Sequence, residues 1–220
     1  MSFIGADDQG FGIAIASSSP AVAARCAHLR SGVGVVASQN VTDPRLGPRL
    51  LDLLERHGDA EAALHRLTTV TELVEYRQLT VLGSDGGAFF SGGHVLGVHA
   101  AVRGDRVVGA GNLLAGEAVI AAGVAAFEDA TGELEERLLS ALLAALDRGG
   151  EAGPLHAAGL LVTRHGRAWN ETDLRVDWSD GDPVAELGDL LRRWLPERDA
   201  YVARAIEPGR APSYGVPGDL

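Results

Sequence analysis

The order of strand-like and helix-like segments is the feature that most constrains the fold of this chain. Phe11–Ala16 alternates large and small residues, which is typical of a strand with one face against a bulky core. Ser2–Ala6 and Gly32–Ser38 are also short and apolar, as strands are. The leucines between residues 46 and 67 recur with a helical period, and Gly58 predicts the end of the first of two helices. A block of strands is therefore followed by a pair of helices.

The same succession of blocks continues along the chain. A second group of strands is followed by two helices, two closing strands and a final helix. The predicted ranges are Tyr76–Leu82, Ala88–Phe90, Val95–Val102 and Arg106–Ala110 for the strands, Glu117–Asp129 and Leu134–Leu146 for the helices, Leu155–Thr163 and Asp173–Val176 for the closing strands, and Asp182 to about Trp194 for the last helix. Blocks of this kind predict an α+β domain of stacked sheets with helices outside, and not the strict alternation of a doubly wound fold.

Length and composition indicate one domain. With 220 residues, of which 46% are hydrophobic, the chain can bury one core of ordinary size. We expect a single domain over residues 1–198 and an extended tail with proline and glycine over residues 199–220. The sequence has no apolar run of the ~18–20 residues that span a membrane and no signal segment. Its one cysteine, Cys26, excludes an intrachain disulfide, and we predict a cytoplasmic protein.

The charged residues exclude several classes of function. Thirty acidic and 19 basic residues give a net charge of −11, which disfavours binding to nucleic acids or to anionic membranes. All 19 basic residues are arginines. Without lysine, the chain cannot form a Schiff base with a substrate, use a serine–lysine dyad or carry the lysine of a phosphate-binding loop.

Motifs for cofactors and metals are weak in this sequence. Gly32–Ala37 matches a relaxed dinucleotide pattern, but β-branched residues and Pro44 follow it where a helix should begin. His94 and His99 lie five residues apart on a predicted strand, hence on opposite faces. We predict neither a metal nor an organic cofactor. Gly109–Asn112, just before a predicted helix, is either a turn that faces a ligand or a plain strand-to-helix joint.

The second residue, Ser2, is a candidate nucleophile. A small residue after an initiator methionine permits removal of that methionine, which leaves a hydroxyl and a free α-amine on one serine. An α-amine has an ordinary pKa of ~7.7–8.0, so near neutrality it can take the hydroxyl proton directly or through a water molecule. If Met1 is retained, the α-amine belongs to methionine and Ser2 is blocked.

Further motifs are spread over residues 2–195. They are Met1-Ser2-Phe3, Phe11–Pro20, Gly32–Asn40, Gly47-Pro48-Arg49, Glu75–Gln78, Gly93-His94, Gly111–Gly116, Asp173–Asp177 and Asp182–Leu187. Together they resemble a bacterial family of unknown function that is grouped with the N-terminal-nucleophile hydrolases.

This resemblance implies a fold, a reaction and a set of site residues. N-terminal-nucleophile hydrolases have a four-layer αββα sandwich and cleave amide bonds through an acyl-enzyme on the first residue of the mature chain, here Ser2. The lysine that assists the amine in the proteasome-like branch is absent, so an arginine or a hydrogen-bonding serine must replace it. The implied neighbours of the amine are Ser17, Ser18, Ser38 and Gln39, the implied oxyanion donor is Asn112, and the implied substrate contacts are Arg77, His94 and Asn40.

Three functions are compatible with these residues. The first is hydrolysis of a small amide or acylated amine without a cofactor. The second is a non-catalytic protein that binds a metabolite or a partner in the cleft of the same fold, and the third is acyl transfer to an amine. An enzyme loses turnover when Ser2 is replaced by alanine, whereas a binding protein keeps its ligand. The apolar strands and the proline-bearing tail favour a homodimer.

Overall fold

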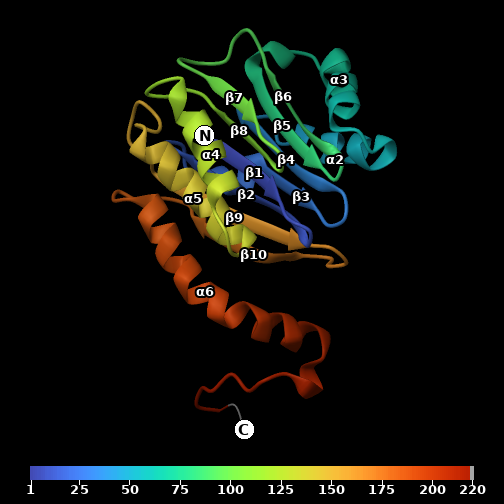
Figure 1. Cartoon of the computed structure of the whole chain (residues 1–220), viewed down its shortest axis with the longest axis vertical. Helices are drawn as coiled ribbons and strands as arrows, with labels where there is room; N and C mark the ends of the chain where they lie inside the picture. The colour runs from blue at the N-terminus through green and yellow to red at the C-terminus, as the bar shows by residue number, and fades with distance from the viewer. Residues whose placement is uncertain (219–220) are drawn as a thin grey trace.

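The computed structural model describes residues 1–218 and contains two antiparallel sheets (Figure 1). The larger sheet has the strand order β10-β9-β2-β1-β8-β7, so the first strand of the chain lies near its middle. Its strands are β1 (Ser2–Ala6), β2 (Gly10–Ser17), β7 (Ala100–Arg103), β8 (Val107–Gly111), β9 (Ala157–Arg164) and β10 (Asn170–Val176). The smaller sheet has the order β3-β4-β5-β6, with strands β3 (Ala27–Arg30), β4 (Gly34–Asn40), β5 (Arg77–Gly83) and β6 (Gly86–Ser91).

Helices cover the outer faces of both sheets (Figure 1). The larger sheet is covered by α4 (Ala118–Asp129), α5 (Leu134–Asp147) and the first half of α6 (Pro183–Ile206), and the smaller sheet by α2 (Leu46–His57) and α3 (Ala60–Val70). The remaining elements are the short helix α1 (Val22–Cys26) and the 3₁₀ turns η1 (Val74–Tyr76) and η2 (Pro208–Arg210).

Three apolar cores separate these layers. The first lies between the larger sheet and its helices and contains Phe3 and Phe127. The second lies between the two sheets and contains Ile4 and Ile13. The third lies between the smaller sheet and α2 and α3, with Leu50 in its middle. The layer order is therefore helix–sheet–sheet–helix, which confirms the expectation of stacked sheets with helices outside.

The position of β1 decides where the first residues point. Side chains alternate along a strand, and here Phe3 contacts the core on the helix side while Ile4 contacts the core between the sheets. Met1 therefore lies with Phe3 on the helix side, where it belongs to the same core. Ser2 lies with Ile4, so its side chain points toward the space between the sheets.

Local signals set several helix ends as expected. Gly58 adopts a φ of 69° and ends α2, a conformation that glycine reaches without strain. The side chains of Glu133 and Glu136 form a capping box at the start of α5. At the start of α6, the side chain of Asp182 accepts hydrogen bonds from two backbone N–H groups of the first turn.

Residues 92–99 form a loop, so the strand expected over Val95–Val102 is wrong for most of its length. Only its end belongs to β7. The cause is a tertiary contact, because the side chain of Asn40 accepts from Leu96 N and donates to the carbonyl of His94. Because of those bonds, the backbone of the loop does not pair with a neighbouring strand. The sequence also did not indicate α1 or β3, which are five and four residues long.

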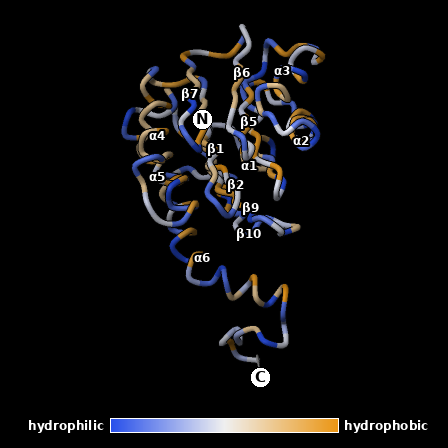
Figure 2. The backbone as a smooth tube through the Cα atoms, turned by 45° about the vertical axis from the view of Figure 1, so that its right-hand side comes forward, coloured by the Kyte–Doolittle hydropathy of each residue, from blue (hydrophilic) through white to orange (hydrophobic). Residues whose placement is uncertain are grey.

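The last helix is longer than expected, and its predicted end at Trp194 is wrong. α6 continues through Pro196 to its last residue at position 206, so part of the tail expected from residue 199 is helical. Pro196 is exposed, so solvent can satisfy the carbonyl that loses its helical bond. Arg198 anchors the following turn through bonds to Glu133 and Glu135. Beyond it the helix projects from the layers, and hydrophobic residues recur along this part (Figures 1 and 2). The last two residues of the expected tail lie outside the described chain.

Candidate functional site

The α-amine of the chain lies in a buried ion pair. Met1 N donates to Ala16 O and to Glu151 Oε1, both at 2.9 Å. Met1 is 3% exposed, and a Cβ on Gly111 would lie 3.1 Å from the Cβ of Met1, so glycine at this position gives Met1 room. Glu151 Oε2 also accepts from Ser18 N at 3.2 Å. One carboxylate therefore ties the start of the chain to the end of β2.

Ser2 follows with its side chain on the inner face of the larger sheet. It is fully buried, and its Oγ has no hydrogen-bond partner in the described part of the chain. In the ladder Ser2 lies between Ile15 of β2 and Ala110 of β8. Buried hydroxyl groups are nearly always bonded, and leaving one unpaired costs about 1–3 kcal/mol. The fold therefore gives the Ser2 hydroxyl no structural task.

Three amide side chains meet between the sheets at this end of β1, and we call them the amide cluster: Gln39, Gln78 and Asn112. Gln78 Oε1 accepts from Gln39 Nε2 at 2.9 Å and from Asn112 Nδ2 at 3.3 Å. Gln78 Nε2 donates to Gly111 O at 3.2 Å, and this bond joins the two sheets. An amide nitrogen has two N–H groups, so Asn112 keeps one donor for another acceptor.

A cleft of about 160 Å³ opens beside the amide cluster. Met1, Glu151, Gln39 and Asn112 line it, together with residues of the loops that follow β2 and β4. Ser2 does not line the cleft, whereas the residue before it does. The α-amine of Met1 is therefore in the cleft. The Ser2 hydroxyl, which has no partner, lies on the next residue, outside the cleft.

Four of the predicted catalytic residues line this cleft: Ser17, Ser18, Gln39 and Asn112. Ser18 contributes its backbone N–H to Glu151, and Ser17 Oγ accepts from the N–H of Ser19 at 3.1 Å. Ser38 is not brought to the cleft. It alternates with Ala37 of the inter-sheet core and donates to Asp43 O at 3.0 Å on the side of α2.

The three predicted substrate contacts cluster around the loop of residues 92–99. Asn40 lines the cleft, and its Nδ2 donates to Tyr76 O at 2.6 Å. The ring of His94 stacks on that of Tyr76 with centroids 4.8 Å apart. Arg77 Nη1 donates to a backbone carbonyl just after β4, and its buried Nε has no partner within residues 1–218. Asn40 is thus at the cleft, while Arg77 and His94 support the neighbouring loop.

Gln78 and Glu151 belong to the site and were not expected from the sequence. Gln78 and Thr80 alternate with the apolar Leu79 and Val81 along β5, a pattern typical of a solvent-facing side, so no local signal marks Gln78 as a buried residue. Glu151 follows two glycines in a loop and reaches Met1 across 150 positions of sequence. No local pattern indicates that contact.

Arg25 brings a positive charge to the cleft. Its guanidinium donates through Nε and Nη2 to Pro20 O, a neutral acceptor, at 3.3 and 3.0 Å.

The adjacent thiol of Cys26 is buried and lies 3.4 Å from Thr42 Oγ1. Burial raises the pKa of Cys26 above its ordinary value, although the bond to Thr42 and the charge of Arg25 oppose that shift. Burial therefore favours the neutral thiol of Cys26, which is less nucleophilic than the thiolate.

The fold and the cleft define a layered α+β protein with a polar site at the amino end of a central, buried strand. Residues 2–187 match the model of a family of unknown function, DUF1028, and the chain belongs to that family.

The solved structures to which the chain is similar include the following two. A member of the same family from Silicibacter pomeroyi has a crystal structure that matches with a TM-score of 0.80 and 27% identity, over 88% of each chain. The Anbu protein (ancestral beta-subunit) from Yersinia bercovieri matches with a TM-score of 0.40 and 13% identity, over 91% of this chain and 96% of that one. The comparison with curated proteins finds no match.

No group of three or more His, Cys, Asp and Glu side chains in residues 1–218 is arranged to hold a metal ion. None of the helices within this range combines the length and apolarity that a membrane crossing requires.

Proposed function

We propose that this protein is an N-terminal-nucleophile amidohydrolase that cleaves a small amide or acylated amine through an acyl-enzyme on Ser2. The observation that carries the proposal is the Ser2 hydroxyl, which is buried without a partner directly behind Met1 at the cleft. Removal of Met1 would open the cleft to this hydroxyl and would create an α-amine on the same residue.

A free hydroxyl suits a nucleophile because its lone pairs must be available to the substrate. A structural serine in this position would bond to a neighbouring carbonyl, as Ser38 does to Asp43. Sites that break a local rule of stability are often functional. The helix–sheet–sheet–helix layers also match the sandwich that the family resemblance implies for N-terminal-nucleophile hydrolases.

The proposed reaction needs only groups of this chain and water. The Ser2 oxygen attacks the amide carbon while the α-amine takes the hydroxyl proton. The free N–H of Asn112 faces the carbonyl oxygen as it becomes negative, and a donor of this kind is worth about 3–4 kcal/mol. The C–N bond then breaks, the α-amine returns the proton to the leaving amine, and water hydrolyses the acyl-serine. Replacing Asn112 by alanine should therefore slow turnover by about 10²–10³-fold.

Arg25 is our candidate for the cation that replaces the missing lysine. It lines the cleft, and no carboxylate within the described residues neutralises it. Its charge would also favour substrates that carry a carboxylate.

A second candidate function is binding without catalysis. The ion pair of the Met1 amine with Glu151, together with the burial of Met1, favours this alternative because both stabilise a chain that keeps its methionine. In that state Ser2 has no α-amine. Acyl transfer to an amine shares the first step of the proposed reaction and differs only in the acceptor.

The first experiment measures the intact mass of the purified protein. The hydrolase proposal predicts a mass that lacks Met1 and turnover in a screen of small amides. Ser2→Ala is the matched variant, because alanine is also small enough to permit methionine removal. It should lose the turnover and the mass shift of a trapped acyl-enzyme, while its circular dichroism spectrum stays that of the wild type. Quantitative retention of Met1 would leave the binding function as the better account, and equal turnover by Ser2→Ala would show that Ser2 is not the nucleophile.

A further inference from the structure

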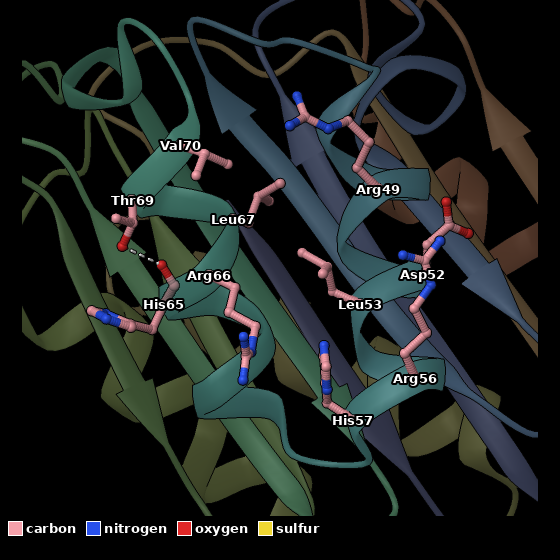
Figure 3. A pocket seen from close by; sticks show the side chains of 10 residues that line it. All are labelled: Arg49, Asp52, Leu53, Arg56, His57, His65, Arg66, Leu67, Thr69 and Val70. Carbon is pink, nitrogen blue, oxygen red and sulfur yellow. Dashed lines mark hydrogen bonds between the residues drawn. The ribbon is translucent and has the colours of Figure 1, made fainter.

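A groove of about 660 Å³ runs between α2 and α3, on the outside of the smaller sheet (Figure 3). It is separated from the Ser2 cleft by that sheet, since the cleft opens between the two sheets. Leu53 of α2 and Leu67 of α3 lie across it from one another, with Val70 at one end (Figure 3). The groove therefore has an apolar floor.

Three arginines line this groove: Arg49, Arg56 and Arg66. Arg49 and Arg56 are seven residues apart, which places them on one face of α2 about 10 Å from each other along the helix. Arg66 and His57 extend into the space between the helices, and His65 lies on the far side of α3 (Figure 3).

The side chains of these three arginines have no hydrogen bond or ion pair within residues 1–218. This is unusual in a chain with 30 acidic and 19 basic residues, where acidic partners are in excess. Asp52 also lines the groove, but its carboxylate is bonded to Arg30 at 2.8 Å. Elsewhere in the described chain only Arg148 and Arg193 share this unbonded state. Three of the five unbonded guanidinium groups thus gather in one groove.

We infer that this groove binds an organic polyphosphate, a ligand with two or more phosphoryl groups on an apolar or aromatic body. Guanidinium groups form paired hydrogen bonds with phosphoryl oxygens, and one phosphoryl group can bridge two of them. The leucine floor suits the body of such a ligand, as in most small-molecule sites. The overall charge of −11 repels free polyphosphate, so binding depends on the local excess of positive charge.

The test is calorimetric titration of the full chain with magnesium-free ATP as the probe. Inorganic tripolyphosphate tests whether the organic body matters, and citrate tests whether any polyanion suffices. The groove variant is Arg56→Gln with Arg66→Gln, and the matched control is Arg193→Gln, an exposed and unbonded arginine of α6. Circular dichroism confirms that each variant is folded.

The inference predicts saturable ATP binding that the groove variant weakens at least about tenfold and that the control leaves unchanged. Binding should also weaken with added salt, because the groove is open to solvent. Tripolyphosphate and citrate should bind more weakly than ATP.

Four results would overturn the inference. ATP binding that stays weaker than about 1 mM leaves no specific site. Equal loss in the control would show a diffuse charge effect. If tripolyphosphate binds as tightly as ATP, the groove does not require an organic body on the ligand. If citrate binds as tightly as ATP, the groove does not require phosphoryl groups. None of these results depends on Ser2, so they test ligand binding in the groove independently of the proposed hydrolase activity.

Discussion

Ser2 and Ser38 are both fully buried, yet only one of the two hydroxyls is bonded. Replacing Ser38 by alanine should lower the free energy of unfolding by about 1 kcal/mol, because a hydrogen bond to Asp43 O is lost. Replacing Ser2 by alanine should leave stability unchanged or raise it by up to about 1 kcal/mol, because an unpaired buried hydroxyl is removed. Urea unfolding of both variants measures the difference.

The pair of variants also tests the premise of the proposed reaction. If Ser2→Ala is as destabilising as Ser38→Ala, the Ser2 hydroxyl is bonded in solution and is not held free for a substrate. The two positions are matched in residue type and burial, so this contrast isolates the missing hydrogen bond.

His28 gives the fold a pH dependence. Its ring packs on Gly47 of α2, where an added Cβ would lie 2.1 Å from the ring, and its Nε2 is buried without a partner in the described residues. Burial lowers the pKa of His28 from its ordinary value of 6.5, although a backbone hydrogen bond to Arg25 opposes the shift. The folded state therefore binds fewer protons than the unfolded state just below pH 6.5, so stability falls as pH drops through that value.

The measurement is the free energy of unfolding at about pH 7.5 and about pH 5.5 for the wild type and for His28→Gln. The wild type should lose more stability than the variant between the two. Asp43 does not interfere, because Arg45 holds its pKa at about 2 and its contribution is lost only in stronger acid. Parallel pH profiles would show that His28 does not titrate with folding.

At the scale of elements, a buried carboxylate joins α5, β9, β10 and α6. Glu135 is fully buried and accepts from Arg164 Nη2 at 3.0 Å, Thr172 Oγ1 at 2.8 Å and Arg198 Nη1 at 3.1 Å. Replacing Arg164 by methionine should lower the free energy of unfolding by about 3 kcal/mol, because a buried charge loses a partner. Replacing Arg106, whose pair with Asp8 is exposed, should change it by less than about 1 kcal/mol. Equal losses would show that the Glu135 carboxylate does not depend on Arg164 as a partner.

The elements that the sequence predicted are those with a strong local signal. Ser2–Ala6 is β1 as expected, and Gly58 ends α2 because glycine takes a positive φ at that position. The misses lie where a distant contact decides. Asn40 holds residues 92–99 as a loop, and Arg198 keeps α6 helical beyond Pro196. Neither contact produces a periodic pattern in the sequence.

At the scale of the molecule, the blocks of strands and helices were enough to predict the layers, since each period tells which face must be buried. The site was predictable only in part. Gln39 and Asn112 were expected at the cleft and lie there, whereas Ser38 faces the other way. Glu151 comes to Met1 because its loop pairs with Leu114, just after β8, so no pattern of neighbouring residues could place it.

The buried ion pair at Met1 has a chemical consequence in a chain without lysine. The α-amine is the only primary amine in this sequence, so an acylating reagent has one amine to modify. The rate of that acylation measures how accessible the α-amine nitrogen is. Held by Glu151 and Ala16, that amine should react slowly until the protein unfolds. A chain that begins at Ser2 would instead carry a 1,2-amino alcohol at its end, which periodate splits to an aldehyde while every internal serine is left intact. Acylation and periodate oxidation together therefore report whether Met1 is present or has been removed.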